Sequence, residues 1–158
     1  MVSFNNCYFL HRDKGWSELN TVKGAIFSNN VFLQEKYFCY SEDVNEFHNN
    51  LFVEGMTETE LPAQVLSNNI YNYPIDSIFV GGNSFNTYKE NFDYHLRQEV
   101  LDIIQGSDGT AIGIYGTAYP FKDGALPYNP HISFKSIAPS TNAEGKIKVN
   151  IKVSAQDR

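Results

Sequence analysis

The sequence predicts an α+β fold in which an antiparallel or mixed sheet packs against one long helix and one or two shorter helices. Apolar residues recur at every fourth position of one segment, which is typical of an amphipathic helix. Near the C-terminus, apolar residues alternate with mostly lysine, which is typical of a half-buried strand. The predicted strands and helices do not alternate regularly, so a doubly wound parallel fold is disfavoured.

The predicted long helix covers about residues 87–105. Thr87 and Glu90 have the spacing of a capping box, and Gly106 suits the position that follows a helix C-terminus. The apolar stripe of this helix contains Tyr88, Phe92, Leu96, Val100 and Ile104. We expect it to pack on the sheet as the main core helix.

The first part of the chain is predicted to form strands, the first of them over residues 4–11. Residues 22–27 and 31–40 are joined by a short segment that contains Asn29 and Asn30, which predicts a β-hairpin. Asparagine tolerates left-handed backbone, so Asn doublets indicate turns and helix ends. The doublets are Asn5-Asn6, Asn29-Asn30, Asn49-Asn50 and Asn68-Asn69. No internal repeat is recognised around them.

Shorter helices are expected after this hairpin. Residues 44–51 place apolar side chains at helical spacing, after the capping residue Ser41. A second short helix over residues 57–66 would begin at a capping box formed by Thr57 and Glu60.

Four further strands complete the prediction. In the last of them, one face is apolar and the other carries lysines that protect a sheet edge. The predicted strands cover residues 75–80, 110–115, 131–137 and 146–154.

Composition restricts the function. The 158 residues predict one domain, residues 1–158, and the net charge of −6 without a basic cluster argues against nucleic acid and anionic membrane as partners. No apolar run is long enough to span a bilayer, and the N-terminus lacks the features of a signal peptide, so we expect a cytoplasmic protein. Cys7 and Cys39 are expected to be reduced thiols, although a disulfide stays open if their segments pair.

A first candidate site contains His131 and Ser133, two residues apart at the start of a strand and therefore on one face. The pattern resembles half of the signature of the two-histidine (2H) phosphoesterases, in which two His-x-Thr/Ser motifs lie on neighbouring strands. The resemblance implies that the histidine is an acid or base and that the hydroxyl holds phosphate. His11, His48 and His95 are not followed by such a hydroxyl.

A second candidate is a glycine-rich turn between a predicted strand and the long helix. Backbone N–H groups at a helix N-terminus bind anions, so this turn is a candidate anion site or else a plain tight turn. It contains Gly81, Gly82, Asn83 and Ser84. No residues stand at the spacing of metal ligands, and we predict neither a metal nor a cofactor.

The third candidate is a loop over residues 116–130. Long loops with shaped glycine and proline positions are often functional, so we expect a ligand pocket or a partner surface, unless the rings fold back over the sheet end. The aromatic residues singled out are Tyr115, Tyr119, Phe121 and Tyr128.

No specific activity follows from these residues. We expect a non-enzymatic binding or interaction protein, because the 12 Phe and 10 Tyr exceed what one modest core buries. It is expected to form a dimer through aromatic surface near residues 116–130 or through a sheet edge other than that of the lysine-lined final strand. A monomer whose rings line a small-molecule pocket is the alternative arrangement. The alternative function is a small His-dependent hydrolase or phosphoesterase centred on His131 and Ser133. In its Asn- and Tyr-rich composition, the chain is similar to unclassified proteins of bacterial mobile elements.

Overall fold

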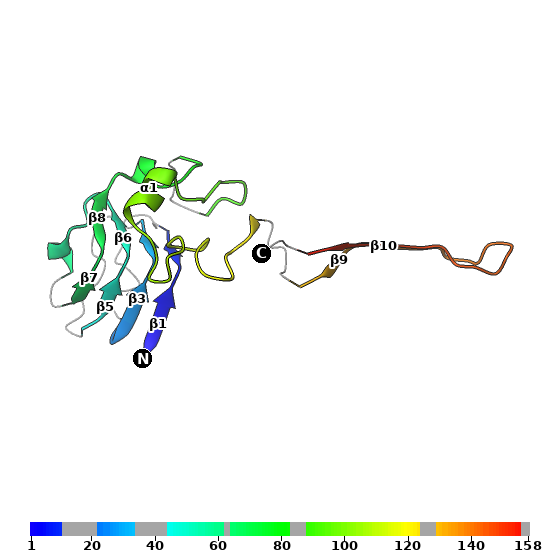
Figure 1. Cartoon of the computed structure of the whole chain (residues 1–158), viewed down its shortest axis with the longest axis horizontal. Helices are drawn as coiled ribbons and strands as arrows, with labels where there is room; N and C mark the ends of the chain where they lie inside the picture. Colours follow the sequence, from blue (N-terminus) through cyan, green and yellow to red (C-terminus); the bar gives the residue numbers. More distant parts are fainter. Residues whose placement is uncertain (11–21, 34–43, 62–63, 83–87, 124–128, 156–158) are drawn as a thin grey trace. The chain divides into compact units, whose positions relative to one another are not determined.

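The computed structural model describes residues 1–10, 22–33, 44–61, 64–82, 88–123 and 129–155. The chain forms two compact units, Met1–Pro120 and Phe121–Arg158. The first unit contains two parallel sheets and one short helix, and the second contains a two-stranded hairpin (Figure 1). The single domain expected over residues 1–158 stays a prediction.

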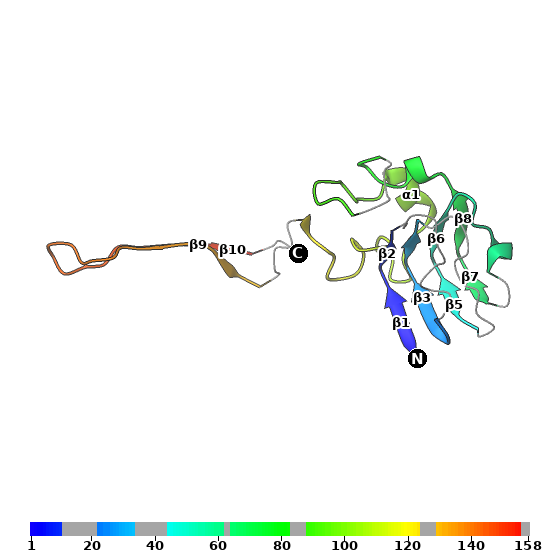
Figure 2. The same cartoon turned by 180° about the vertical axis from the view of Figure 1, so that it is seen from behind.

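The first unit is a parallel β-solenoid whose strands belong to two sheets, called here sheet A and sheet B. Sheet A contains β1 (Val2–Asn5), β3 (Ala25–Ser28), β5 (Glu46–His48) and β7 (Val65–Ser67), paired in that order. Sheet B contains β2 (Tyr8–Phe9), β4 (Val31–Phe32), β6 (Leu51–Val53) and β8 (Ile70–Tyr73), also paired in that order. Every pair within both sheets is parallel, so each successive coil of the chain stacks on the preceding one (Figure 2).

Aromatic rings fill the space between the two sheets. Along sheet A, the ring of Phe27 stacks on Phe4 at 4.9 Å and on Phe47 at 4.7 Å between ring centroids. Along sheet B, Phe32 stacks on Phe9 at 4.5 Å and on Phe52 at 4.8 Å. These separations match the distance between neighbouring strands, so each of the first three coils adds one ring to each stack. In the fourth coil Tyr71 continues the stack of sheet B, and Leu66 takes the equivalent position in sheet A.

An asparagine turns the chain from sheet A to sheet B in each coil. Asn6, Asn29, Asn49 and Asn68 have φ values of 52°, 58°, 53° and 52°. Asparagine is one of the few residues that adopts this left-handed conformation readily. The corner is therefore encoded locally, and it recurs after 23, 20 and 19 residues.

The residue after each corner forms a ladder of side-chain amides along the solenoid. The Asn50 side chain accepts from the backbone N–H of Asn30 at 2.9 Å and donates to the Phe27 carbonyl at 3.0 Å. Asn69 makes the same bonds to Asn50 and Phe47. Because Asn30 and Asn50 are fully buried, the ladder satisfies polar groups that water cannot reach. Cys7 occupies this position in the first coil, where its N–H donates to Asn30.

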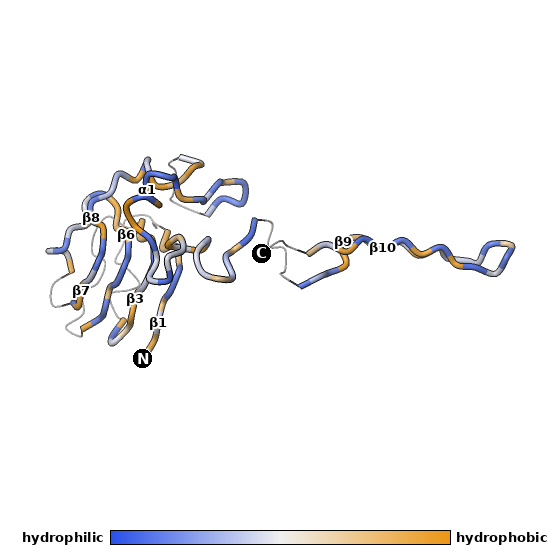
Figure 3. Tube along the Cα trace, viewed as in Figure 1, coloured by the Kyte–Doolittle hydropathy of each residue, from blue (hydrophilic) through white to orange (hydrophobic). Residues whose placement is uncertain are grey.

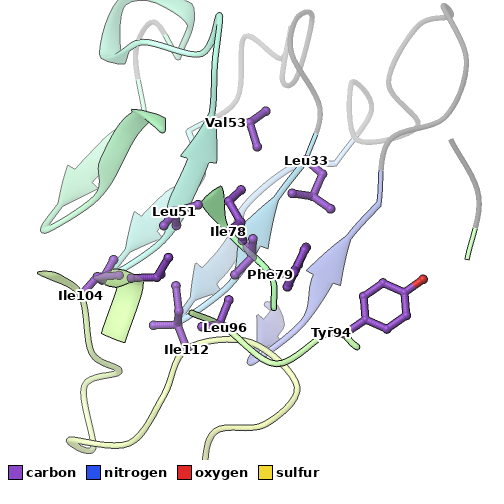
Figure 4. Close-up of a cluster of buried hydrophobic side chains, with 11 residues drawn as sticks. Leu33, Leu51, Val53, Ile78, Phe79, Tyr94, Leu96, Ile104 and Ile112 are labelled. Atoms are coloured by element: carbon purple, nitrogen blue, oxygen red, sulfur yellow. The ribbon is translucent and has the colours of Figure 1, made fainter. Parts of the chain in front are cut away.

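A second apolar cluster covers the outer face of sheet B. Leu51 and Val53 point away from the aromatic stacks and contact a segment that follows the fourth coil. That segment contains η3 (Ile75–Ser77), α1 (Gln98–Ile103) and an isolated antiparallel bridge between Phe79 and Leu96. Figure 4 shows Ile78, Phe79, Leu96, Ile104 and Ile112 gathered over the strands of this sheet.

Corner asparagines also fasten the loop that follows α1. The Asn6 side chain donates to the Gly113 carbonyl at 3.1 Å, and the Gly113 N–H donates to the Asn29 carbonyl at 2.7 Å. Gly113 has a φ of 75°, and a Cβ there would overlap the ring of Tyr8. Glycine is therefore required at this close approach.

The second unit contains β9 (His131–Ile137) and β10 (Val149–Ser154), which pair antiparallel. Ile137 faces Val149 and Ile132 faces Val153, with a register shift between Lys152 and Val153. This confirms the strand predicted over residues 131–137 and the antiparallel strand predicted over residues 146–154, which begins three residues later than expected. Figure 3 shows hydrophobic and hydrophilic residues alternating along the hairpin.

The predicted α+β fold class with its antiparallel or mixed sheet is wrong for the first unit, because both of its sheets are entirely parallel. The expectation that the chain lacks a repeat is wrong for the same reason. Phe27-Ser28-Asn29-Asn30-Val31-Phe32 and Phe47-His48-Asn49-Asn50-Leu51-Phe52 are equivalent stretches of two coils. The coils differ in length, so the Asn doublets do not recur at a constant interval and their spacing alone does not indicate a repeat.

The long helix predicted over residues 87–105 is also wrong, since α1 begins at Gln98. Tyr94 and Leu96 are buried because the chain is extended there, with alternate side chains pointing into the core. Val80 and Gly81 donate backbone hydrogen bonds to His95 and Asp93 across this extended segment. Tyr94 and Leu96 are buried two residues apart, and Val100 and Ile104 follow at intervals of four. In the sequence this spacing resembles the apolar face of one helix.

The predicted hairpin that joins residues 22–27 to residues 31–40 is wrong as far as residue 33, where the described part of this segment ends. β3 and β4 pair with strands of neighbouring coils and lie in different sheets. The helix expected over residues 44–51 consists of β5 and the first residue of β6. Inward and outward side chains alternate within each strand, but the corner at Asn49 shifts this alternation by one residue between β5 and β6. The apolar residues of the two short strands therefore have a combined spacing that resembles a helix.

The remaining corrections concern short segments. The helix expected over residues 57–66 is a single 3₁₀ turn, η2 (Glu58–Glu60), followed by the start of β7. The strand expected over residues 75–80 is replaced by η3 and the Phe79 bridge, and residues 110–115 form no strand. Among the residues that the structure describes, no helix has the length and apolar character that crossing a bilayer requires.

Candidate functional site

The outer face of sheet A is the face of the solenoid that the second apolar cluster does not cover. Strand alternation directs Phe27 and Phe47 inward, so the residues on either side of them point outward. The strand register aligns Asn5, Ser28, His48 and Ser67 in one row across the sheet. The row is polar and continuous, with one side chain from each coil.

Three side chains of this face are joined by hydrogen bonds. The Nδ1 atom of His48 lies 2.6 Å from the Ser67 hydroxyl oxygen, and its Nε2 atom lies 3.0 Å from a carboxylate oxygen of Glu46. Glu46 and His48 are two residues apart on β5, and Ser67 is the register partner of His48 on β7. The His48 and Glu46 side chains are 29% and 40% exposed, so the group is open to solvent.

The partners determine which ring nitrogen carries the proton. An ionised carboxylate only accepts hydrogen bonds, so Nε2 of His48 must donate to Glu46. In a neutral imidazole the other nitrogen is then an acceptor, and the Ser67 hydroxyl donates to Nδ1. A hydroxyl bonded to a base, which is itself oriented by a carboxylate, is the arrangement of an activated nucleophile.

A second histidine lies on the segment that covers sheet B. The Nδ1 atom of His95 lies 2.7 Å from Asp93, and the ring stacks on Tyr115 at 3.9 Å between centroids. The backbone N–H of His95 also donates to Asp93, and these two hydrogen bonds hold the pKa of that carboxyl below its ordinary value.

The apolar face of the hairpin, defined here as Ile132, Ile137, Val149, Ile151 and Val153, is a different kind of candidate. The exposed fractions of these residues range from 49% to 62%. Lys135, opposite Ile151, is the charged residue on the same face, while Lys152 and Asn150 alternate onto the other. Exposed aliphatic side chains gathered on one face typically mark a contact.

The first predicted site, His131 and Ser133, lies at the start of β9. The Ser133 hydroxyl donates to the Lys152 carbonyl at 3.3 Å and accepts from Ser154 at 2.9 Å. The Nδ1 atom of His131 is buried and has no hydrogen-bond partner among the described residues. The two residues are not hydrogen-bonded to each other, and a phosphoesterase site at this position stays a prediction.

The predicted anion site lies in a turn whose N–H groups are engaged. Gly81 donates to the Asp93 carbonyl at 3.0 Å and Gly82 to the Phe79 carbonyl at 3.1 Å. A Cβ on Gly81 would lie 2.8 Å from the Phe92 ring, so close packing accounts for this glycine. The helix on which the anion hypothesis depended does not begin here, and Asn83 and Ser84 lie outside the described residues.

The aromatic residues of the predicted loop lie in different surroundings. Tyr115 is half-buried between His95 and Tyr8, whereas Tyr119 is 72% exposed. Phe121 is exposed and belongs to the second unit, and Tyr128 lies outside the described residues. A ligand pocket or partner surface at this loop stays a prediction.

The thiol of Cys7 is free, and its burial raises its pKa, so it is a weak nucleophile. Cys39 lies outside the described residues. Within the described ranges, no group of three His, Cys, Asp or Glu residues is arranged to hold a metal ion.

Comparison with known proteins gives no match: no family model, no curated protein and no solved structure is similar to this chain. Sequence reasoning missed Glu46, His48 and Ser67 as a group because it placed residues 44–51 on a helix. The signal was Glu-x-His before an Asn doublet, together with Ser67 before the next doublet.

Proposed function

We propose that this protein is an interaction protein that forms a dimer through the apolar face of its hairpin. The exposure of five branched aliphatic side chains on one side of β9 and β10 is the observation that carries this function. A two-stranded hairpin is at best marginally stable by itself in water, and packing against a further layer stabilises it. A second copy of the same hairpin supplies such a layer.

The size of the surface suits two copies. Half-exposed aliphatic side chains of this number present on the order of 500 Å² per copy, which approaches the area of small specific interfaces. Two such faces pack as sheets do, about 10 Å apart. One self-complementary patch is sufficient for a two-fold dimer.

Charge also favours self-association through this face over the other. The face that carries Lys152 and Asn150 would bring like charges together, since residues 121–158 contain 6 basic and 3 acidic residues. Association through the apolar face brings together only the two copies of Lys135. The long aliphatic stem of this lysine can lie over apolar neighbours while its ammonium group reaches water.

Sedimentation equilibrium at micromolar concentration tests this function. We expect the wild type at twice 17.9 kDa, Ile151→Asp as a monomer, and Asn150→Asp as a dimer. The two variants add the same charge to neighbouring positions of β10, so they differ only in the face they change. A wild-type protein that sediments as a single 17.9 kDa species contradicts the proposed function.

The proposal includes a cytoplasmic location and an origin in a bacterial mobile element. The free thiol of Cys7 is compatible with a reducing compartment.

A further inference from the structure

We infer that the outer face of sheet A carries a serine nucleophile site for acyl transfer, in which Ser67 attacks, His48 is the general base and Glu46 is a positioning residue. The substrate class is a carboxylic ester that can reach an open sheet surface. This site lies in the solenoid and is independent of the interface proposed for the hairpin.

The hydrogen bonds make a chain in the required order. Ser67 donates to Nδ1 of His48 at 2.6 Å, and Nε2 of His48 donates to Glu46 at 3.0 Å. Both distances are within the reach needed for proton transfer and for orienting the base. In the serine proteases Nε2 of the histidine contacts the serine and Nδ1 contacts the carboxylate, and in this protein the two nitrogens are exchanged. One nitrogen still accepts the serine proton, and the other is still held by a carboxylate.

The solenoid holds these side chains on a rigid element. Phe47, between Glu46 and His48, is fully buried and stacks on Phe27 at 4.7 Å. The Asn69 side chain donates to the Phe47 carbonyl at 2.9 Å, which ties β5 to the following coil. Sites built on packed strands keep their geometry better than sites on loops.

A candidate oxyanion donor is the backbone N–H of the residue that follows the nucleophile. In the preceding coils the N–H of the corner residue donates to the next strand, as Asn49 does to the Ser67 carbonyl at 3.0 Å. β7 is the last strand of sheet A among the described residues, and the N–H of Asn68 has no partner there. This N–H follows the nucleophile directly in the sequence, and a free backbone N–H that reaches the developing negative charge stabilises the tetrahedral intermediate.

The reaction proceeds in two balanced steps. The Ser67 oxygen forms a bond to the acyl carbon while its proton passes to Nδ1 of His48, and the ester C–O bond then breaks as His48 returns the proton to the leaving alcohol. Water next attacks the acyl-serine, giving its proton to His48. The carboxylic acid leaves, and Ser67 recovers the proton.

The surroundings limit the substrate. Ser28 and Asn5 continue the row beyond His48, so small polar side chains flank the site on the side of the earlier coils. An open, flat row of this kind accommodates an ester carried on an extended molecule. Ile26 and Val65, the register partners of Glu46, lie in the next row of the same face, and their small apolar surface suits a short acyl group.

Hydrolysis of p-nitrophenyl acetate by the full chain tests this site, together with covalent labelling by phenylmethylsulfonyl fluoride. We expect turnover above the buffer rate, and one label per chain located by mass spectrometry on Ser67. Ser67→Ala and His48→Gln should each lower the rate at least about 100-fold. Glu46→Gln should slow both labelling and turnover, with Glu46→Asp retaining more of each.

Ser136→Ala is the matched control, because Ser136 lies on β9 of the hairpin and has no place in this site. It should hydrolyse and label as the wild type does. A wild-type rate equal to that of Ser67→Ala, or a label on Ser28, would overturn the inference. Circular dichroism of each variant confirms that the solenoid is intact, and the sedimentation result for the hairpin does not affect this outcome.

Discussion

The solenoid unit and the hairpin unit place the same kinds of apolar residue in opposite surroundings. In the solenoid, Phe27 and Phe47 are fully buried between two sheets, whereas in the hairpin Phe134 and Ile151 are about half exposed. Residues 1–120 contain 15 acidic and 6 basic residues, and residues 121–158 contain 3 and 6. The acidic unit buries these apolar side chains within itself, whereas the basic hairpin leaves its own about half exposed.

The largest expected effect is on the aromatic stacks of the solenoid. Phe47→Ala removes a buried ring that contacts Phe27 of the preceding coil and Phe52 of its own coil, and it should lower the free energy of unfolding by about 3–5 kcal/mol. Phe134→Ala removes a 49% exposed ring from the hairpin and should change it by less than about 0.5 kcal/mol. Urea unfolding measures both, and equal effects would contradict the contrast between the units.

The amide ladder is expected to contribute almost as much. Asn50→Ala leaves the buried Asn30 N–H and the Phe27 carbonyl without their partner, which should cost about 2–4 kcal/mol. Asn150→Ala changes an exposed asparagine of β10 and should be neutral within about 0.5 kcal/mol. If Asn50→Ala also proves neutral in urea unfolding, the ladder is not a source of stability.

The smallest expected effect concerns an exposed pair of the solenoid unit. Hydrogen bonds from His95 lower the pKa of Asp93, so the ionised carboxylate stabilises the folded state. This contribution is complete above the unfolded pKa of about 3.9 and is lost as the pH falls toward the lower folded value. Wild type should therefore exceed Asp93→Asn in stability at neutral pH, and the two should converge in acid.

Urea unfolding of both proteins at several pH values checks this convergence. The difference should be small, because Asp93 is on the surface and solvent screens it. A difference that stays constant from neutral to acid pH would mean that the substitution acts through packing.

The candidate site illustrates what sequence reasoning could reach. Glu46 and His48 lie two residues apart, so predicting a strand over residues 46–48 would have placed them on one face. Ser67 is 19 residues from His48, and only the register between β5 and β7 brings them to 2.6 Å. No local pattern connects the two residues, which is why the predicted sites fell on turns and on the hairpin instead.

The sequence by itself determined two local features. Strict alternation over residues 146–154 predicts a strand with one apolar face, because side chains alternate within every strand whatever it pairs with. Asparagine at the doublets predicts left-handed turns, because its conformational preference is intrinsic. The structure has the strand β10, and it has the left-handed conformation at Asn6, Asn29, Asn49 and Asn68.

Only the tertiary structure decided that these turns are corners of a parallel solenoid. A strand of two to four residues is compatible with a hairpin, a helix end or a coil, and its pairing depends on residues about 20 positions away. Asn50 is buried because Asn30 and Asn69 lie above and below it, and Phe47 because Phe27 does. Each coil is stable only against its neighbours, so the interaction that selects the fold is absent from any single segment.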